Sequence, residues 1–534
     1  MTQREDPSIR VSSKDLRLGV DVGGTNTDAV VVDGNGHIIV ETKTATTPDP
    51  IDGIIDAITT VIDQIDDTSR LGKAMLGTTH PTNAIIRRRD LDRVGVLRLA
   101  APSSLGVRPS ANWPDDLRDL VIGRSQIIEG GFEYDGTPIA PLDEDAIRRF
   151  AGECAGDVSA VAVSCAFSPA CTDHELQAAA IIEAECGADL PVSLSHTVGS
   201  LGLLERENAT ILNASLLTVA RRVVNGFRDT LADLGLDVES FLTQNDGTLM
   251  TVEEADRYPV LTVGSGPTNS MRGACALAGL TDALVIDVGG TSADIGILVN
   301  GFPRESTAAV EVGGVRTNFR MPDLISVGLG GGTIVRHDGE ADGAGVTVGP
   351  DSVGYRVISD AMCMGGPTLT LSDVSLAVGR LDGFGDPSLL RGVENEICEA
   401  AITWVDERIG VLGERMKASS TPLPLMAVGG GAHLVPAELS GFSEVIWPPH
   451  HSVANAFGAA IAEAAGSIDK VYSYDATSRE DCLRSAREEA TDAAIRAGAN
   501  AGEVRITSVV EIPMTYVPGG GCRVIVKAVG PLAA

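Results

Sequence analysis

The sequence predicts an α/β protein built from two related halves and a smaller unit at the C-terminal end. Apolar runs that suit buried strands alternate with stretches of helical apolar spacing along most of the 534 residues. A short glycine-containing segment near the start occurs again 266 positions later, counted from Asp21 to Asp287. The chain is also too long for a single core, so two or three domains are expected.

The repeated segment is predicted to form a strand, a turn and a second strand. The first copy reads LGVDVGGTNTD from Leu18 to Asp28, and the second reads LVIDVGGTSAD from Leu284 to Asp294. Each glycine pair lies between two apolar runs of the kind found in buried strands. Each copy is therefore expected to be a hairpin with glycines at its tip. A P-loop or a dinucleotide fingerprint requires a helix after the glycines, and the pattern here predicts a strand instead.

The composition of the hairpin tips suits a phosphate and metal site. Glycine lets a ligand approach the backbone N–H groups, and a carboxylate at a strand end can hold hydrated Mg²⁺. Asp21 and Asp287 are therefore the candidate catalytic and Mg²⁺-binding residues. Asp28 and Asp294 are expected either to brace each turn or to bind cation-held water. The candidate phosphate-binding residues are Gly23, Gly24, Thr25 and Asn26 in the first hairpin and Gly289, Gly290, Thr291 and Ser292 in the second.

The duplicated Asp-x-Gly-Gly-Thr hairpins resemble the two phosphate motifs of the actin-like ATPase superfamily. That superfamily binds ATP between two related domains of ribonuclease H-like fold, so the resemblance implies that the two leading aspartates face each other across an ATP site. Residues 425–431 read as a strand entering a glycine turn. In the superfamily a comparable turn approaches the adenosine. The further candidate nucleotide-binding residues are Gly429, Gly430 and Gly431.

Several segments resemble, in order, those of the hydantoinase A/oxoprolinase family, and the resemblance spans roughly residues 16–465. The first of them, GTTHPTNA at 77–84, follows a predicted strand. Its polar residues are candidates for substrate binding or for capping the next helix. These residues are Thr79, Thr82 and Asn83. The chain departs from the usual family pattern at Asn26 and Ala293, which puts the substrate in question more than the ATP site.

The family resemblance implies a particular chemistry. Members that open hydantoins, oxoproline or lactams transfer the γ-phosphoryl group of ATP to the amide oxygen, after which water opens the ring. The resemblance implies the phosphorylating A-type subunit, with ATP and Mg²⁺, a small cyclic amide substrate, and a separate B-type hydrolytic subunit in a hetero-oligomer. The alternatives are an ATP-dependent carboxylase subunit of the acetone or acetophenone carboxylase kind, a non-catalytic ATP-binding switch protein, and a sugar kinase.

Composition limits the partners. A formal charge of −32 disfavours nucleic acid and anionic membrane as ligands, because both require a basic surface. The polar start and the lack of an apolar run of transmembrane length predict a soluble cytoplasmic protein. The nine cysteines, without any Cys-x-x-Cys, are expected to be buried thiols. His450 and His451 are expected to lie in a loop without a ligand role rather than to bind a metal.

The predicted domains are an N-terminal actin-like domain at 15–195, a second actin-like ATPase domain at 196–470 and a small α/β segment at 471–534. Apolar spacing predicts helices over 51–65 and 203–234, the second ending before Gly235. A small-residue helix is expected over 453–465. In the C-terminal segment, a helix over 479–497 is expected to precede strands at 504–517 and 522–529, joined by PGGG at 518–521.

Overall fold

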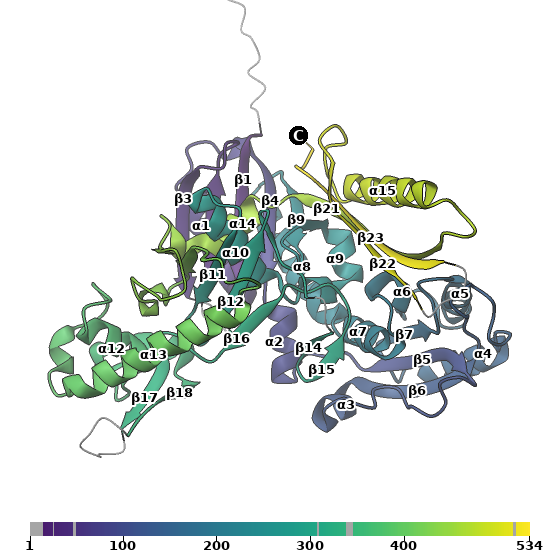
Figure 1. Cartoon of the computed structure of the whole chain (residues 1–534), viewed down its shortest axis with the longest axis horizontal. Helices are drawn as coiled ribbons and strands as arrows, with labels where there is room; N and C mark the ends of the chain where they lie inside the picture. Colours follow the sequence, from purple (N-terminus) through teal and green to yellow (C-terminus); the bar gives the residue numbers. More distant parts are fainter. Residues whose placement is uncertain are drawn as a thin grey trace, which may run out of the picture.

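The structure is a computed structural model that describes residues 14–24, 26–45, 50–306, 309–337, 345–515 and 520–533. Its strands form sheets of nine, six and four strands and two strand pairs within these ranges. The two largest sheets each contain one of the predicted hairpins, and helices lie between the sheets and on their outer faces (Figure 1). The predicted α/β fold is confirmed.

The nine-stranded sheet holds the first hairpin, and its order is β22-β23-β21-β10-β9-β4-β1-β2-β3. Helices α1 (Pro50–Ile62) and α8 (Leu217–Asp233) pack on one face. α14 (Ala454–Ala460) packs on the opposite face. The strands are β1 (Leu16–Val22), β2 (Asn26–Val32), β3 (Ile38–Ala45), β4 (Leu71–Thr78), β9 (Glu239–Thr243), β10 (Leu249–Thr251), β21 (Ala464–Ser473), β22 (Arg505–Pro513) and β23 (Gly521–Gly530).

The six-stranded sheet holds the second hairpin, with the order β13-β12-β11-β19-β20 and β16 paired to β12. α12 (Leu371–Ala377) and α13 (Asn395–Met416) cover one face, and α10 (Ser265–Ala278) covers the other. The strands are β11 (Ala283–Val288), β12 (Ala293–Val299), β13 (Phe302–Pro303), β16 (Leu324–Val327), β19 (Leu425–Val428) and β20 (Val445–Ile446).

A parallel four-stranded sheet in the order β6-β5-β7-β8 is inserted between β4 and β9. α4 and α5 pack on one face, and α7 packs on the other. The elements are β5 (Val94–Ala101), α3 (Asp115–Val121), β6 (Ile122–Glu129), α4 (Glu144–Cys154), β7 (Ala160–Cys165), α5 (Asp173–Cys186), β8 (Val192–Leu194), α6 (Ser195–Val198) and α7 (Leu203–Ser215). The remaining elements are α2 (His80–Arg87), α9 (Val252–Arg257), β14 (Val310–Val312), β15 (Val315–Thr317), β17 (Thr333–His337), β18 (Val346–Ser352), α11 (Val357–Asp360) and α15 (Arg479–Arg496).

Helices α10 and α14 form the layer between the two large sheets (Figure 1). Glycine makes their contact possible. A Cβ on Gly273 would lie 1.9 Å from the carbonyl oxygen of Ala454, and one on Gly458 would lie 1.9 Å from that of Asn269. Because side chains are absent at these crossings, the two helices can carry residues to both hairpins.

Two predicted helices differ from the structure. The helix expected over 203–234 is two helices, α7 and α8, which meet at Leu216. α7 is buried almost throughout, whereas α8 packs one face on the nine-stranded sheet. The apolar spacing runs on across the break without a glycine or proline, so the sequence pattern could not show it. The helix expected over 453–465 ends at Ala460, because the chain enters β21 at Ala464.

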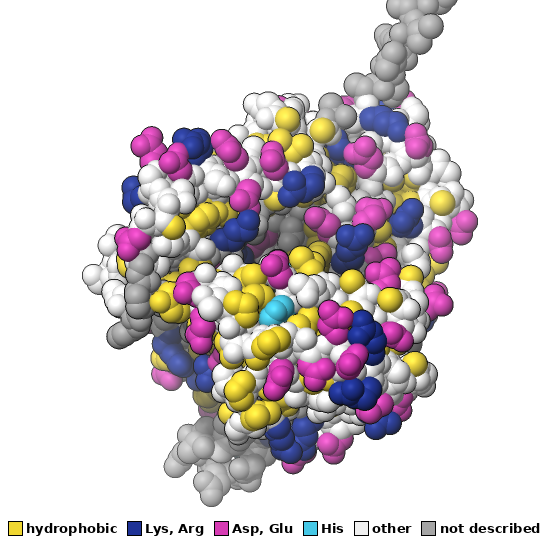
Figure 2. Space-filling view, turned by 90° about the vertical axis from the view of Figure 1, so that its right-hand side faces the viewer, with side chains coloured by type: hydrophobic (Ala, Val, Ile, Leu, Met, Phe, Trp, Pro, Cys, Tyr) yellow, Lys and Arg dark blue, Asp and Glu magenta, His cyan; other side chains and the backbone are white. Residues whose placement is uncertain are grey.

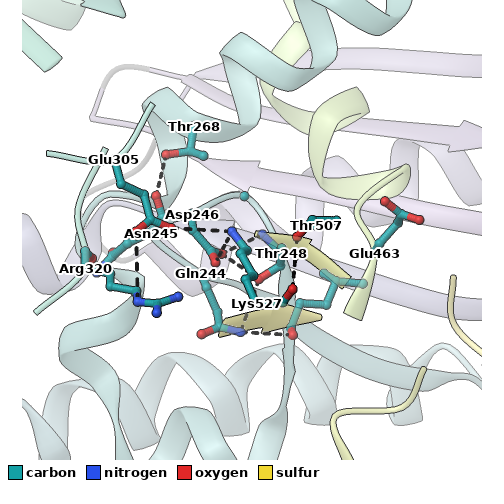
Figure 3. Close-up of polar contacts among 12 residues, drawn as sticks. Gln244, Asn245, Asp246, Thr248, Thr268, Glu305, Arg320, Glu463, Thr507 and Lys527 are labelled. Carbon is teal, nitrogen blue, oxygen red and sulfur yellow. Dashed lines mark hydrogen bonds and ion pairs between the residues drawn. The ribbon is translucent and has the colours of Figure 1, made fainter. Parts of the chain in front are cut away.

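The C-terminal segment contains the predicted helix and strands, and its strands extend the nine-stranded sheet. Lys527 on β23 binds Asp246 in the β9–β10 turn at 2.7 Å and lies 3.7 Å from Glu305, which follows β13 (Figure 3). Its ammonium group also lies 5.1 Å from the ring centre of Phe302. One buried lysine therefore joins the C-terminal strands to both large sheets. Of the loop expected at 518–521, residues 518 and 519 lie outside the described residues.

The surface is rich in charged side chains (Figure 2) and the cysteines are free thiols, as the composition predicts. Acidic and basic side chains are interspersed over the face in Figure 2. Among the described helices, none combines the length and apolarity needed to cross a membrane. All nine cysteines are free thiols, and seven of them are buried.

Candidate functional site

The two predicted hairpins are present and are built alike. Asp21 pairs with Asp28 across β1 and β2, and Asp287 pairs with Asp294 across β11 and β12. Each turn is closed by an equivalent backbone hydrogen bond, 3.0 Å from Gly23 N to the Asn26 oxygen and 2.9 Å from Gly289 N to the Ser292 oxygen. The predicted phosphate-binding residue Thr25 lies outside the described residues. Thr291 and Ser292 are exposed at the second tip.

Asp21 is a buried carboxylate held by two amides. Its side chain is 2% exposed and accepts hydrogen bonds from Asn269 at 3.3 Å and Asn455 at 3.0 Å. Burial, with the nearby charge of Asp28, raises the pKa of Asp21 to about 7. A Cβ on Gly77 would lie 2.2 Å from the carboxylate oxygen, so glycine at this strand end makes the space for it. The two neutral amides therefore stabilise the charged form of Asp21 only in part.

Asp287 is held by the residue next to Asn269 on α10. Ser270 donates a hydrogen bond to it at 2.5 Å. Burial raises the pKa of Asp287 although this bond and the charge of Lys43 act to lower it. Gly429, with φ +86°, leaves room for the carboxylate, because a Cβ there would lie 2.3 Å from its oxygen. Adjacent side chains of one helix thus fix one aspartate from each hairpin.

Lys43 on β3 is a site residue that the sequence analysis missed. Its ammonium group donates to both oxygens of Asp28 at 2.6 and 2.8 Å and to the Ser452 carbonyl at 2.9 Å. Its Cε lies 3.8 Å from the position of a Cβ on Gly430. Lys43 therefore lies between the first hairpin and the glycine turn of the second half. Nothing in the sequence around Lys43 distinguished it from the other lysines.

The glycine turn expected at 429–431 follows β19 and lies against the second hairpin, and its approach to a nucleotide stays a prediction. Gly431 N donates to the Val288 oxygen at 2.7 Å. A second glycine run encloses the same tip, since Gly331 N donates to Gly289 at 3.0 Å and Gly332 N donates to Gly290 at 2.7 Å. This run, GLGGGT at 328–333, had no role among the sequence predictions.

Thr79 bonds the first hairpin and Asn83 bonds Thr79, whereas Thr82 bonds the chain just before α10. The Thr79 hydroxyl makes no side-chain cap on α2 and donates instead to the Val22 carbonyl at 3.1 Å. Thr82 donates to the carbonyl of Val263, and Asn83 lies 3.4 Å from the Thr79 hydroxyl. These contacts place the segment beside Asp21, and a role in substrate binding stays a prediction.

The remaining candidates have internal partners. Asp294 accepts a hydrogen bond from Ser326, and burial raises its pKa to about 6. The ring of His450 contacts Glu41 at 2.6 Å, whereas the carbonyl of His451 accepts from Gly429 N. The two adjacent histidines therefore have different surroundings. Within the described residues no group of three or more His, Cys, Asp or Glu is arranged to hold a metal ion.

The residues around Asp21 and Asp287 fit a hydrated Mg²⁺, which needs few protein ligands. Both groups are oxygen donors, and neither bonds a Lys or Arg within the described part of the chain. The Oδ1 atom of Asn269 is also buried there without a hydrogen-bond partner among described residues. Two carboxylates, a free amide oxygen, glycine backbone and one lysine form a donor set suited to a metal-bound polyphosphate.

Fold and hairpins together define an α/β protein of the actin-like class. Residues 17–186 match the Hydantoinase/oxoprolinase N-terminal region, and residues 206–385 match Hydantoinase/oxoprolinase. The chain belongs to the hydantoinase/oxoprolinase family, which confirms the resemblance seen in the sequence.

Individual relatives point to more than one activity. The chain is 27% identical to caprolactamase subunit alpha of Pseudomonas jessenii over 80% of its length and 64% of that protein. It is 26% identical to the acetophenone carboxylase gamma subunit of Aromatoleum aromaticum over 68% of its length and 53% of that protein. The crystal structure of ATP-dependent caprolactamase from Pseudomonas jessenii matches with a TM-score of 0.76 at 22% identity, and the match covers 97% of this chain and 88% of that one. The chain thus spans less than two thirds of the length of these curated relatives.

Proposed function

We propose that this chain is the phosphorylating subunit of an ATP-dependent enzyme that opens a cyclic amide. The observation that carries the proposal is the pairing on α10, where Asn269 holds Asp21 and Ser270 holds Asp287. This pairing fixes one carboxylate from each phosphate-type hairpin relative to the other. A relative named caprolactamase subunit alpha supports the choice of a cyclic amide.

In this proposal the residues of the chain position the reacting groups and neutralise phosphate charge, and they form no covalent bond to the substrate. Asp21 and Asp287 would hold Mg²⁺, which when bound supplies positive charge against the phosphates. Backbone N–H groups at the hairpin tips bind phosphate oxygens, and Lys43 adds a cation next to the glycine turn. Asp28 keeps that lysine in place, and Asp294 braces the second turn through Ser326.

An amide is hydrolysed slowly because resonance stabilises its carbonyl group. The proposed step forms a bond between the amide oxygen and the γ-phosphorus while the bond from phosphorus to ADP breaks. Water then adds to the carbon and the ring C–N bond breaks, which leaves an amine and an acyl phosphate. A second water adds to the same carbon, and phosphate leaves with the former amide oxygen, so that a carboxylate remains. We assign the water step to a separate B-type subunit, because the relatives are named as subunits. A hetero-oligomer in the cytoplasm, where ATP is supplied, follows from this assignment.

The test is ADP release with Mg²⁺ across hydantoins, 5-oxoproline, lactams of several ring sizes and sugars. Stimulation by a cyclic amide that disappears in Asp287→Ala supports the proposal. Asp282→Ala is the matched control, because Asp282 is an exposed aspartate just before β11. Stimulation by a sugar with a stable phosphorylated product would contradict the proposal.

A carboxylase subunit is the second candidate. It is favoured by the similarity to the acetophenone carboxylase gamma subunit over 68% of this chain. The same donor set would serve phosphoryl transfer to a ketone enolate or to bicarbonate. ADP release that requires bicarbonate together with a ketone, and not a cyclic amide, would select this function.

A further inference from the structure

The turn between β9 and β10 bonds helix α10 at three points. Gly264 N, at the start of α10, donates to the side-chain oxygen of Asn245 at 2.6 Å, and the Thr268 hydroxyl donates to the Asn245 carbonyl at 2.8 Å. One helical turn further on, the guanidinium of Arg272 donates to the Gly247 carbonyl. The three contacts are four residues apart, so they lie along one face of the helix. The turn therefore fixes both the position and the rotation of α10.

The same helix carries the residues that hold the two aspartates. Asn269 directly follows Thr268 and donates to Asp21 at 3.3 Å, and Ser270 donates to Asp287 at 2.5 Å. Because the two donors are adjacent on one helix, a rotation of α10 about its axis would move both of them together. The β9–β10 turn is thus connected through α10 to one carboxylate of each hairpin.

The C-terminal unit, made of β21, α15, β22 and β23, anchors the other side of this turn through Lys527 (Figure 3). Its Nζ lies 2.7 Å from one oxygen of Asp246, and the other oxygen accepts from Thr248 N at 3.0 Å. Burial acts to raise the pKa of Asp246, but the charge of Lys527 and its hydrogen bond hold that pKa well below its usual value. Asp246 is therefore an anion that depends on Lys527, and without this cation the turn loses its anchor.

A second contact leads from Lys527 to α10 through Phe302 on β13. The ring centre of Phe302 lies 5.1 Å from the Lys527 ammonium group and 4.9 Å from the guanidinium carbon of Arg272. Both cations are attracted to the same aromatic ring. Lys527 therefore reaches α10 by the β9–β10 turn and by this ring.

We propose that Lys527 is a positioning residue for the phosphoryl transfer, through which the C-terminal unit sets the places of Asp21 and Asp287 by way of the β9–β10 turn and α10. This inference rests on the proposed function, because it takes the two aspartates as the pair that holds Mg²⁺. It gives the C-terminal helix and strands a part in the reaction, which their sequence did not indicate.

The experiment measures ADP release against Mg²⁺ concentration with the cyclic amide that stimulates wild type, at a temperature where every variant is folded. Lys527→Met should raise the Mg²⁺ concentration for half-maximal rate roughly 2- to 30-fold, because displaced carboxylates hold the metal less well. A smaller folded fraction would lower the rate without this shift. Lys527→Arg keeps the charge and should restore the wild-type value. Arg523→Met is the matched control, since Arg523 is on the same strand and bonds Asp469 at 2.8 Å within the C-terminal unit.

The route through α10 is tested with a double variant. Because Lys527→Met already displaces α10, adding Asn269→Ala should lower the rate less than the product of the two single effects. Single effects that multiply, an unchanged Mg²⁺ dependence in Lys527→Met, or an equal shift in Arg523→Met would overturn the inference. If Lys527→Met does not fold, Thr268→Val, which loses the hydroxyl that bonds the turn, takes its place beside Thr268→Ser, which keeps it. Equal Mg²⁺ dependence of these two would overturn the inference.

Failure of the proposed function is a separate outcome. Wild type whose ADP release no cyclic amide stimulates would refute that function, and amide hydrogen exchange over 265–278 would then decide whether the C-terminal unit holds α10. Faster exchange in Lys527→Met than in Arg523→Met would support the connection, and equal exchange in the two variants would overturn it.

Discussion

Asp21→Asn should stabilise the protein while it removes activity. The carboxylate is 2% exposed, and its pKa rises from 3.8 to about 7 on folding. Because the folded pKa lies above the unfolded one, the folded state binds a proton that the unfolded state releases. Stability is therefore complete below pH 3.8 and falls as the pH rises to 7. The cost in free energy of unfolding is at most about 4 kcal/mol at pH 8 and less than about half of that at pH 5.

An asparagine at position 21 can be accommodated without adding to the number of unpaired groups, because turning the Asn269 amide only exchanges which of its two polar atoms lacks a partner. It brings one N–H₂ group, which needs an acceptor. Asn269 Oδ1 is buried without a partner among the described residues, and a rotation of the Asn269 amide would present it to the new donor. The Thr243 hydroxyl, which now accepts from Asn269 at 2.9 Å, can turn to donate instead.

The assay is chemical denaturation of both proteins at pH 5 and pH 8. The increase in the free energy of unfolding caused by Asp21→Asn should be larger at pH 8 than at pH 5. ADP release should be lost at both pH values. Asp33→Asn is the control, because hydrogen bonds from the His37 and Asn35 backbone lower the pKa of this partly exposed aspartate. Asp33→Asn should give no increase in the free energy of unfolding that grows with pH. A loss of stability in Asp21→Asn at pH 8 would refute the reasoning.

Three other predictions follow from the same contacts. Lys43→Met should lower ATP turnover, measured as ADP release, at least tenfold, and Lys43→Arg should retain more of it. Turnover equal to wild type in Lys43→Met would show that Lys43 has no role in the site. Gly429→Ala should destabilise by about 1–3 kcal/mol from its positive φ and displace Asp287, seen as a lower Tm and weaker Mg²⁺ binding; a Tm equal to wild type would contradict this. Lys527→Met should leave the partly buried carboxylate of Asp246 without its cation and cost up to about 3 kcal/mol in denaturation, with Asp246→Asn in the same chain recovering part of it; no recovery would disprove the pairing.

The hairpins could be predicted because their information is local. Apolar strands on both sides of a glycine pair fix the turn, and the copy at 284–294 repeats the same pattern. The glycine turn at 429–431 was found for the same reason. Each depends on neighbours within about ten residues, which a sequence pattern records directly.

The residues that hold the aspartates could not be predicted because their contacts are distant. Asn455 lies 434 positions from Asp21, and Asn269 lies 248 positions from it. Lys43 reaches Ser452 across 409 positions. A lysine or an asparagine on an ordinary strand or helix carries no local signal of such a contact, and only the packing of α10 against α14 brings these side chains together.

The central claim is that the amide oxygen receives the γ-phosphoryl group. The direct measurement supplies a cyclic amide that stimulates ADP release, labelled with ¹⁸O in its carbonyl, and determines the mass of the phosphate formed by the chain with its partner subunit. The account predicts ¹⁸O in the phosphate in a one-to-one ratio with opened rings. Opened rings that keep all of the label, together with unlabelled phosphate, would contradict it.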